Sequence, residues 1–338
     1  MAVVRTVVHE TIAPGVGLAL DRLLLRRAHV DGSPRLHVFA WPGDVLAVGR
    51  YHRIPDGADA AVHRRLSGGR TVVGGDGFVG VSLALPHRSA LESAEPYALR
   101  AEQTMNRAVR GILGGLELLG VDAHYPGRDL VTAGGKPIGW LSLAVEDDGA
   151  ALFEAGVSLG RDLAVLSGLA DRVDPTGVVP TTMWLPDDVT SVARVRGGVP
   201  PSFAEAASAL LEGFQRRLGV RVVRDTDLEP SADTRDARVD FDVPARLDRH
   251  GERATMLGVL RAHCRVDHDG SLAEVRLSGD LIAPAATLAA IEGALRGLPA
   301  ARAPIVARVA PLLDGGEHFL LGAGAEDVSE AVVQAASR

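Results

Sequence analysis

The residue types most able to do chemistry gather around the only lysine of the chain. Lys136 stands alone among 36 lysine and arginine residues. Arginine therefore serves wherever a surface cation suffices, and lysine differs from it in carrying a compact point charge with three rotatable donors. Placed against an oxygen that gains negative charge during a reaction, such an ammonium would stabilise that charge. The alternative interpretation is a solvated turn residue, because Gly134 and Gly135 precede it.

A second stretch, residues 64–86, combines arginines with glycines. Arg64 and Arg65 come shortly before Gly68 and Gly69, and six glycines fall between Gly68 and Gly80. Glycine lets backbone amides approach a ligand closely, and arginine forks bind anions. The stretch lacks the Gly-Lys-Ser/Thr of a P-loop and the strand-to-helix setting of a dinucleotide fingerprint. It predicts either an anion site or a pair of hairpin turns.

Alternation and helical periodicity predict the elements that must hold these residues. The expected helices are 18–28, 97–119, 163–169 and 202–218, and Ser202 is a candidate N-cap for the last of them. The expected strands are 35–41 and 45–50, which form a pair, a pair around Lys136, and 152–159. Glycines inside the helix 97–119 indicate close packing, which we expect to be against a sheet.

The C-terminal third predicts a smaller unit of its own. Residues 225–253 are rich in Asp, Arg, Pro and Ser, which is typical of a linker. Strands at 255–266 and 272–277 and helices at 285–295 and 325–336 are expected to follow. We therefore predict two domains, residues 1–245 and 246–338, and an α+β fold: a mixed sheet flanked by helices, with a small α+β C-terminal domain.

Composition excludes several classes of function. A net charge of −7 argues against a nucleic-acid surface, and 4% aromatic residues argue against base-stacking platforms. The single cysteine, Cys264, excludes an intramolecular disulfide framework and fits a reducing cytoplasm. The sequence contains neither an apolar run long enough to span a membrane nor an N-terminal signal-peptide pattern. We expect a cytoplasmic protein that binds neither nucleic acid nor membrane.

Three ordered stretches resemble the lipoate–protein ligase family, within the biotin and lipoate ligase superfamily. The family pattern runs from Gly-Arg-Tyr/Phe through Arg-Arg-x-Ser/Thr-Gly-Gly-Gly and Asn-Asp-Leu/Ile to Lys-Ile-Ser/Ala-Gly. The tail from Leu257 to Leu313 is similar to the family's C-terminal accessory domain, so the resemblance covers most of the chain. The matching positions in this sequence are Gly49, Arg50, Tyr51, Arg64, Arg65, Ser67, Gly68, Gly69, Gly77, Ser82, Asp129, Leu130, Lys136 and Gly139.

The resemblance implies an enzyme that activates lipoate, or a related acid such as octanoate, with ATP. The acyl-adenylate would then pass its acyl group to a lysine of a lipoyl carrier domain, of the 2-oxoacid dehydrogenase E2 or glycine cleavage H protein type. Lys136 would stabilise charge in the first step, and Asp129 would hold either Lys136 or a Mg²⁺ ion. Val72, Val79, Val81 and Leu83 would form a sleeve for the acyl tail. The remaining substrate- and ATP-binding positions would be Arg50, Arg64, Arg65, Ser67, Gly68, Gly69, Arg70, Gly77 and Gly139.

Departures from the family pattern leave alternatives open. Arg70 replaces the third glycine of the loop, where it would either face a phosphate or block part of the acyl pocket. The usual His-Asp pair is Gly74-Gly75, the following Asn is Phe78, and Trp140 stands where the family has a small residue. The alternatives are an acyltransferase between carrier proteins, a degenerate member that only binds an acyl group or a carrier, and, on weaker grounds, a biotin ligase. A thioester route would need a catalytic cysteine, whereas Cys264 is expected to pack structurally.

Overall fold

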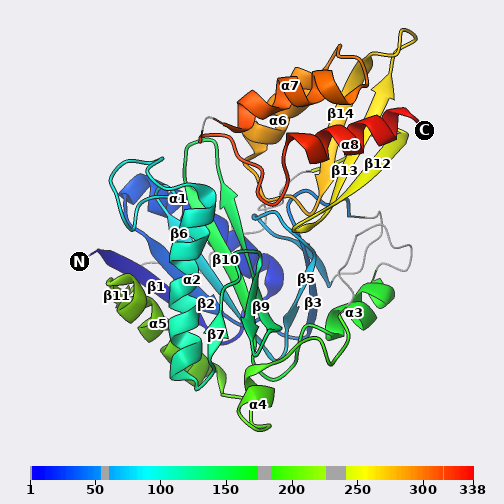
Figure 1. Cartoon of the computed structure of the whole chain (residues 1–338). Helices are drawn as coiled ribbons and strands as arrows, with labels where there is room; N and C mark the ends of the chain where they lie inside the picture. Colours follow the sequence, from blue (N-terminus) through cyan, green and yellow to red (C-terminus); the bar gives the residue numbers. More distant parts are fainter. Residues whose placement is uncertain (1, 55–60, 174–183, 226–240, 315) are drawn as a thin grey trace.

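An eight-stranded mixed sheet forms the centre of the molecule (Figure 1). The computed structural model describes residues 2–54, 61–173, 184–225, 241–314 and 316–338. In spatial order the strands are β11-β1-β2-β6-β10-β9-β8-β7. β1 is parallel to both neighbours, and all the other pairs are antiparallel. The strands span β1 Val3–His9, β2 Arg35–Phe39, β6 Phe78–Leu85, β7 Ala123–His124, β8 Leu130–Ala133, β9 Lys136–Val145, β10 Ala151–Ser158 and β11 Arg221–Arg224.

Two helices cover one face of this sheet. α2 (Ala101–Leu118) and α5 (Phe203–Leu218) pack against each other and share a core with β6, β9 and β10. Gly111 faces the Phe214 ring so closely that a methyl group would collide with it. The close packing expected of the α2 glycines is therefore present, but its partner is helix α5 and not a sheet. As predicted, the Ser202 side chain caps α5 by accepting from the amide of Glu205.

The opposite face carries helix α1 (Pro14–Asp31) and a second, three-stranded sheet, which share another core. The second sheet has the order β4-β3-β5, with bounds Val62–Arg64, Asp44–Val48 and Val72–Gly75. The predicted pairing of strands 35–41 and 45–50 is wrong. β2 pairs with β1 and β6 in the large sheet, whereas β3 pairs with β4 and β5. Two short helices, α3 (Val165–Val173) and α4 (Val192–Val195), follow β10.

The C-terminal part forms a sheet-and-helix unit with its own core. Its antiparallel sheet is β12-β13-β14, and helices α6, α7 and α8 pack with it (Figure 1). β12 begins at Arg249, inside the stretch predicted to be a linker, and α7 was not predicted. The bounds are β12 Arg249–Thr255, β13 Gly258–Val266, β14 Leu272–Gly279, α6 Ala285–Leu295, α7 Arg302–Leu313 and α8 Ala325–Ala336.

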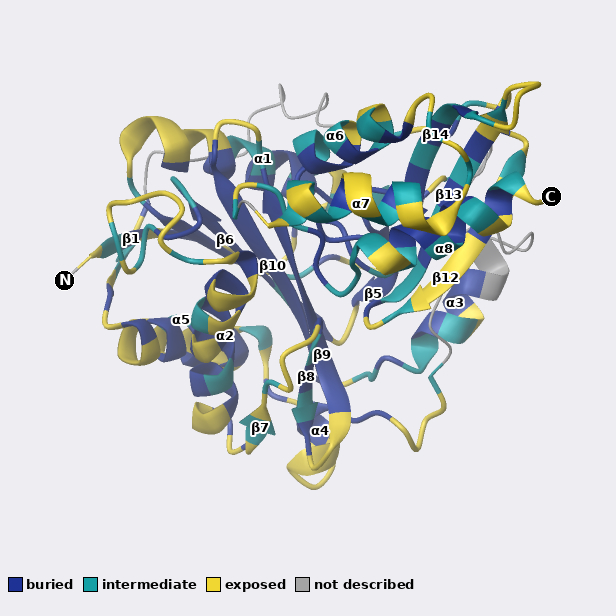
Figure 2. Cartoon of the chain, turned by 45° about the horizontal axis from the view of Figure 1, so that its top comes forward, coloured by how far each residue is buried: buried dark blue, intermediate teal, exposed yellow. Residues whose placement is uncertain are grey.

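These layers confirm the predicted α+β class, with a helix-flanked mixed sheet and a smaller α+β unit. The predicted boundary after residue 245 remains a prediction, and residues 226–240 of the expected linker lie outside the described part of the chain. Within the described ranges, no helix has the length and apolar character needed to cross a membrane. Figure 2 shows the central strands β6 and β10 buried, while the turn between β8 and β9 is exposed.

A row of polar residues crosses the otherwise apolar centre of the sheet. His37 of β2, Ser82 of β6, Glu154 of β10 and Ser142 of β9 are paired in register across four adjacent strands. All four side chains are buried. Asp21 of α1 lies over the row, 2.8 Å from Nδ1 of His37, and accepts a hydrogen bond of 2.7 Å from the Ser82 hydroxyl. The row therefore brings charge into the protein interior next to the glycine-rich stretch.

Candidate functional site

Arg65 is the charged residue at the centre of the candidate site. It follows β4 and is 1% exposed. Its Nη2 donates to the carbonyl oxygens of Gly68 and Arg70, both at 2.9 Å, and its guanidinium lies 4.5 Å from the ring centroid of Trp140. Among the described residues, Nε and Nη1 of Arg65 have no hydrogen-bond partner. Buried donors of a charged group are normally satisfied, so this fork is suited to an anionic ligand.

The electrostatics of Arg65 support that interpretation. Burial lowers the pKa of Arg65 to about 10, although the carboxylates of Glu154, Asp129 and Asp280 oppose the shift. Burial likewise raises the pKa of Glu154, against the opposing effect of Arg65. Both shifts favour the neutral forms, so desolvation outweighs the mutual attraction of the pair. An additional negative charge at the free side of Arg65 would offset part of that cost.

Hydroxyl groups add further unused hydrogen-bonding capacity around the same loop. Ser67 and Thr71 are fully buried, and neither hydroxyl oxygen has a partner within the described part of the chain. The amide of Ser67 donates to Oε2 of Glu154 at 2.7 Å, which fixes the loop over the polar row. Ser142 extends this contact by donating to the carbonyl of Gly68 at 2.9 Å. Arginine donors and hydroxyls together are a donor set for a carboxylate or a phosphate.

Gly68 and Gly69 contact the C-terminal unit. The amide of Gly69 donates to the carbonyl of Leu281 at 2.7 Å, and a methyl group on Gly68 would collide with that same carbonyl. His52 lies 3.1 Å from both the Gly69 carbonyl and the Asp280 carboxylate. In this conformation the two glycines allow close backbone packing, and the Gly69 amide does not face open space. The predicted role of both amides in binding phosphate stays a prediction.

Arg70 and Asp129 form an ion pair beside the loop. Nε and Nη2 of Arg70 both donate to the carboxylate of Asp129, which is 2% exposed. Burial raises the pKa of Asp129, and the Arg70 charge opposes that shift. Asp129 therefore has arginine as its partner. Both predicted roles of Arg70, facing a phosphate or blocking part of the acyl pocket, stay predictions.

The described residues contain no group of three or more His, Cys, Asp or Glu side chains able to hold a metal ion. Mg²⁺ requires near-octahedral oxygen coordination, usually from one or two carboxylates together with waters and substrate phosphates. Asp129 is committed to Arg70. The predicted role of Asp129 in binding Mg²⁺ therefore stays a prediction.

Lys136 lies apart from this cluster. It is the first residue of β9, directly after the Gly134-Gly135 turn, and it is exposed. Ser142, which contacts Gly68, is on the same strand; a rise of about 3.3 Å per residue separates the two by roughly 20 Å. Gly139 lies between them, where a methyl group would collide with the Gly156 carbonyl of β10. Lys136 therefore lies at the start of β9, and the loop that contains Gly68 contacts the same strand further along, at Ser142.

Three other predicted residues have structural partners. Arg50 donates to Glu146 at 2.7 Å. Arg64 donates to the carbonyls of His52 and Phe241 at 3.0 and 2.9 Å. Gly77 has φ +85° in the turn before β6, and its carbonyl accepts the amides of residues 159 and 160. Only the Arg65–Arg70 segment and Asp129 come together as one cluster.

The predicted acyl sleeve is divided between two cores. Val72 packs in the core between the two sheets, whereas Val79, Val81 and Leu83 pack in the core under α2. Alternate residues of a strand point to opposite faces, so the three β6 residues turn away from the face that Val72 covers. The sleeve prediction is therefore wrong for these four residues taken together.

Glu154 and Ser142, which hydrogen-bond to the loop, and Asp280, which pairs with His52 beside it, were not predicted as site residues. Glu154 was detectable, because a lone carboxylate in the run Leu152-Phe153-Glu154-Ala155 is rare in a buried strand unless it is paired. Ser142 and Asp280 carried no comparable signal. Their importance comes from register and from the packing of the C-terminal unit.

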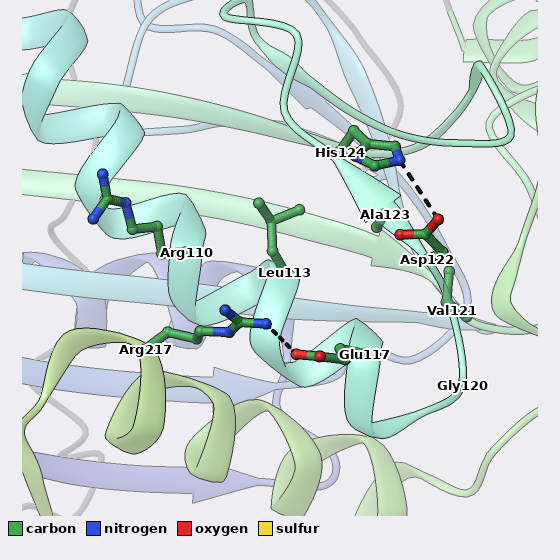
Figure 3. A pocket seen from close by; sticks show the side chains of 9 residues that line it. All are labelled: Arg110, Leu113, Glu117, Gly120, Val121, Asp122, Ala123, His124 and Arg217. Carbon is green, nitrogen blue, oxygen red and sulfur yellow. Dashed lines mark hydrogen bonds and ion pairs between the residues drawn. The ribbon is translucent and has the colours of Figure 1, made fainter.

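A separate groove lies at the C-terminal end of α2 (Figure 3). It has a volume of about 730 Å³. Four of its charged groups pair locally: Arg217 with Glu117, and His124 with Asp122 at 3.7 Å. None of the predicted site residues lines it, and its lining adds no buried, unpaired side-chain donor to those found in the described part of the chain. It carries no functional assignment.

Comparisons with known proteins bear on the fold. No family model and no curated protein matches this sequence. Among solved structures, P. falciparum LipL1 in complex with lipoate matches with a TM-score of 0.62 at 10% identity, over 92% of this chain and 94% of that one. The chain has the lipoate–protein ligase fold.

Two further structures agree with this conclusion. A bi-partite lipoate protein ligase from Thermoplasma acidophilum gives a TM-score of 0.54 at 19% identity, covering 70% of this chain and 91% of its own. A lipoate-protein ligase A bound with ATP gives 0.52 at 19% identity, covering 69% and 92%.

Proposed function

We propose that this protein is an ATP-dependent acid–protein ligase of the lipoate-ligase type, active in the cytoplasm. The observation that carries the proposal is the buried Arg65 guanidinium, which lies beside the hydroxyls of Ser67 and Thr71. Two donors of Arg65 and both hydroxyls have no hydrogen-bond partner among the residues that the structure describes. A site of this kind suits the carboxylate of an acid or the phosphate to which it becomes joined. The lipoate–protein ligase fold supports a ligase, since the solved structures that share it include ones with lipoate or ATP bound.

The proposed reaction has two steps. A carboxylate oxygen of the acid attacks the α-phosphorus of ATP, pyrophosphate leaves, and an acyl-adenylate forms. The amine of a carrier lysine then attacks the acyl carbon; AMP leaves, and the amine proton passes to solvent. Arg65 and the Ser67 hydroxyl would hold the carboxylate and stabilise charge on the acyl-phosphate oxygens, in a site from which water is largely excluded. The acid is lipoate, octanoate or a related carboxylic acid, and the carrier is a lipoyl domain of the E2 or H-protein type.

Lys136 is proposed to act at the same reaction. Its ammonium would neutralise phosphate or carboxylate charge as the adenylate forms. In the conformation described, the lysine is exposed at the start of β9. This role therefore requires that the turn between β8 and β9 approach the loop, or that the bound nucleotide extend along β9 to reach it.

The test is pyrophosphate release with ATP and a panel of carboxylic acids. We expect the protein to release pyrophosphate with at least one acid and Arg65→Met to lower the rate at least 100-fold. The matched control is Arg246→Met, which removes an exposed arginine paired with Glu274 and should leave the rate unchanged. Lys136→Arg should fold normally yet lose activity, because it keeps the charge without the point-charge geometry. Absence of pyrophosphate release with every acid would show that the ligase proposal is wrong.

A second candidate is an acid- or carrier-binding protein that performs no ATP chemistry. The observation that favours it is the Gly69 amide, which donates to Leu281 instead of facing a ligand. Acid binding without pyrophosphate release would support it, and transfer of an acyl group between carriers would identify an acyltransferase. A thioester route through Cys264 is disfavoured, since burial raises the pKa of its thiol and it packs in the C-terminal core.

A further inference from the structure

His52 is a buried imidazole with one ring nitrogen in use and the other free. It follows β3 in the chain and is 1% exposed. Its Nε2 lies 3.1 Å from the Gly69 carbonyl oxygen and 3.1 Å from Oδ1 of Asp280. A carbonyl and an ionised carboxylate only accept hydrogen bonds, so Nε2 carries the proton and Nδ1 of the neutral ring has a lone pair. Nδ1 is buried and has no hydrogen-bond partner among the residues that the structure describes.

The free Nδ1 of His52 is not explained by a structural role. Buried polar atoms normally have a partner, and leaving one without costs about 1–3 kcal/mol. The contacts of His52 with its neighbours use only the Nε2 donor, which a glutamine amide would also supply. The imidazole adds one property to these contacts: a buried acceptor that can take up a proton. An incoming group with an N–H bond would satisfy this acceptor.

Asp280 holds the imidazole and is itself firmly placed. Its Oδ2 accepts the amide of Val259 at 2.7 Å, and a methyl group on Gly258 would collide with that oxygen, so the carboxylate has little room to turn. Its Oδ1 faces His52. A fixed carboxylate beside Nε2 favours the imidazolium that forms when Nδ1 accepts a proton. The Arg64 guanidinium, which donates to the backbone carbonyl of His52 at 3.0 Å, opposes this effect.

The imidazole and the Arg65 guanidinium hold the same short segment of the loop. Arg65 donates to the carbonyls of Gly68 and Arg70. His52 donates to the carbonyl of Gly69, which lies between them in the chain. Consecutive Cα atoms are about 3.8 Å apart, so the two side chains contact the backbone within roughly 4 Å of each other along the segment. The base and the anion-binding fork therefore belong to one site.

We propose that His52 is the general base of the transfer step and that Asp280 is its positioning residue. The inference rests on the proposed function for the acyl-adenylate and the carrier lysine. The neutral amine of that lysine attacks the acyl carbon, and a C–N bond forms. An N–H proton of the amine passes to Nδ1 of His52. The bond from the acyl carbon to the phosphate oxygen breaks, AMP leaves with that electron pair, and the imidazolium then releases the proton to solvent.

The experiment separates the transfer step from the ATP chemistry. Octanoyl-adenylate or lipoyl-adenylate is supplied to the full chain with an E2-type lipoyl domain, and the acylated domain is measured by mass spectrometry. His52→Gln keeps a donor but cannot accept a proton, so transfer should fall about 100-fold or more. Pyrophosphate release from ATP should stay nearly unchanged. The matched control is His263→Gln in the C-terminal sheet, where the ring contacts Ser278, and it should transfer at the unaltered rate.

Two further measurements separate a base from a structural contact. Added imidazole should restore part of the transfer rate of His52→Ala, because a soluble base can enter the space that the ring leaves. Asp280→Asn should lower transfer about 10-fold or more. The double variant Asp280→Asn with His52→Gln should be no slower than His52→Gln alone, since the carboxylate acts only through the imidazole. Multiplied losses in the double variant would overturn the positioning role of Asp280.

The remaining outcomes distinguish this inference from the proposed function. Unchanged transfer in His52→Gln, with normal pyrophosphate release, would overturn the inference and leave the ligase proposal standing. Equal loss of both steps in His52→Gln, or no transfer from either adenylate by the unaltered protein, would also overturn the inference. Transfer that depends on His52, without pyrophosphate release from ATP and any acid, would keep the inference and refute the ligase.

Discussion

Removal of the Glu154 charge is the most direct test of the electrostatics at the loop. In Glu154→Gln, the side-chain oxygen can still accept the Ser67 amide, so the change isolates the charge. Arg65 then loses the carboxylate that acts on it most strongly. Removal of one partner of a buried pair of charges costs about 3–5 kcal/mol of unfolding free energy, because the remaining charge is uncompensated. The Asp129 and Asp280 carboxylates also act on Arg65, so we expect the low end of that range, about 3 kcal/mol.

Urea unfolding followed by tryptophan fluorescence measures this loss. The three tryptophans, Trp41, Trp140 and Trp184, all precede the C-terminal unit, so the signal reports the part of the chain that holds the pair. The unfolding midpoint should fall with an unchanged m value. Arg65→Met with Glu154→Gln should lose less than the sum of the two single changes, by roughly 1–3 kcal/mol. A loss below about 0.5 kcal/mol in Glu154→Gln, which is the range of ordinary surface changes, would refute the reasoning.

Two further predictions concern the C-terminal unit. Gly68→Ala should displace Leu281 and lower the free energy of unfolding by about 1–3 kcal/mol, seen as faster hydrogen exchange in residues 279–283. The control is Gly293→Ala, which has open space around it and should stabilise α6 by about 0.5–1 kcal/mol. Equal effects of the two changes would contradict this account. Burial, followed by the nearby charges of His250 and Arg261, lowers the pKa of His263 to about 4. The stability due to neutral His263 is therefore present above pH 6.5 and is lost as pH falls through about 4. The loss should be about 1–2 kcal/mol after allowance for solvent screening. Thermal unfolding at pH 7, 5 and 4 measures it, and the control His263→Gln should not show it.

Local sequence signals predicted most elements of the fold because each depends on nearby residues. The helix 202–218 combined a capping serine with a 3.6-residue apolar period, and the structure has α5 at Phe203–Leu218. The predicted pairing of strands 35–41 and 45–50 failed for a different reason. The turn between them looked like a hairpin, but partner choice depends on strands far along the chain. Helix α7 was missed because Pro304 and Pro311 interrupt a helical pattern, although Pro304 lies in its first turn, where proline is tolerated.

The candidate site was predicted in part. The Arg65–Gly69 segment was found because arginine and glycine have recognisable roles near anions. The partners that decide its chemistry could not be found in this way. Glu154 reaches the loop through the register of β10, and Leu281 reaches it through the packing of a distant unit.

The polar row across β2, β6, β10 and β9 also constrains how the chain folds. Phe153 and Ala155, the neighbours of Glu154, belong to the apolar core under α2. A slip of one residue in β10 would exchange the two faces of the strand and place the carboxylate in that core without Arg65 or Ser67. Burial of such a group without a partner is strongly unfavourable. The row therefore selects one alignment of the four central strands, and a misaligned sheet would be rejected during folding, before any substrate is present.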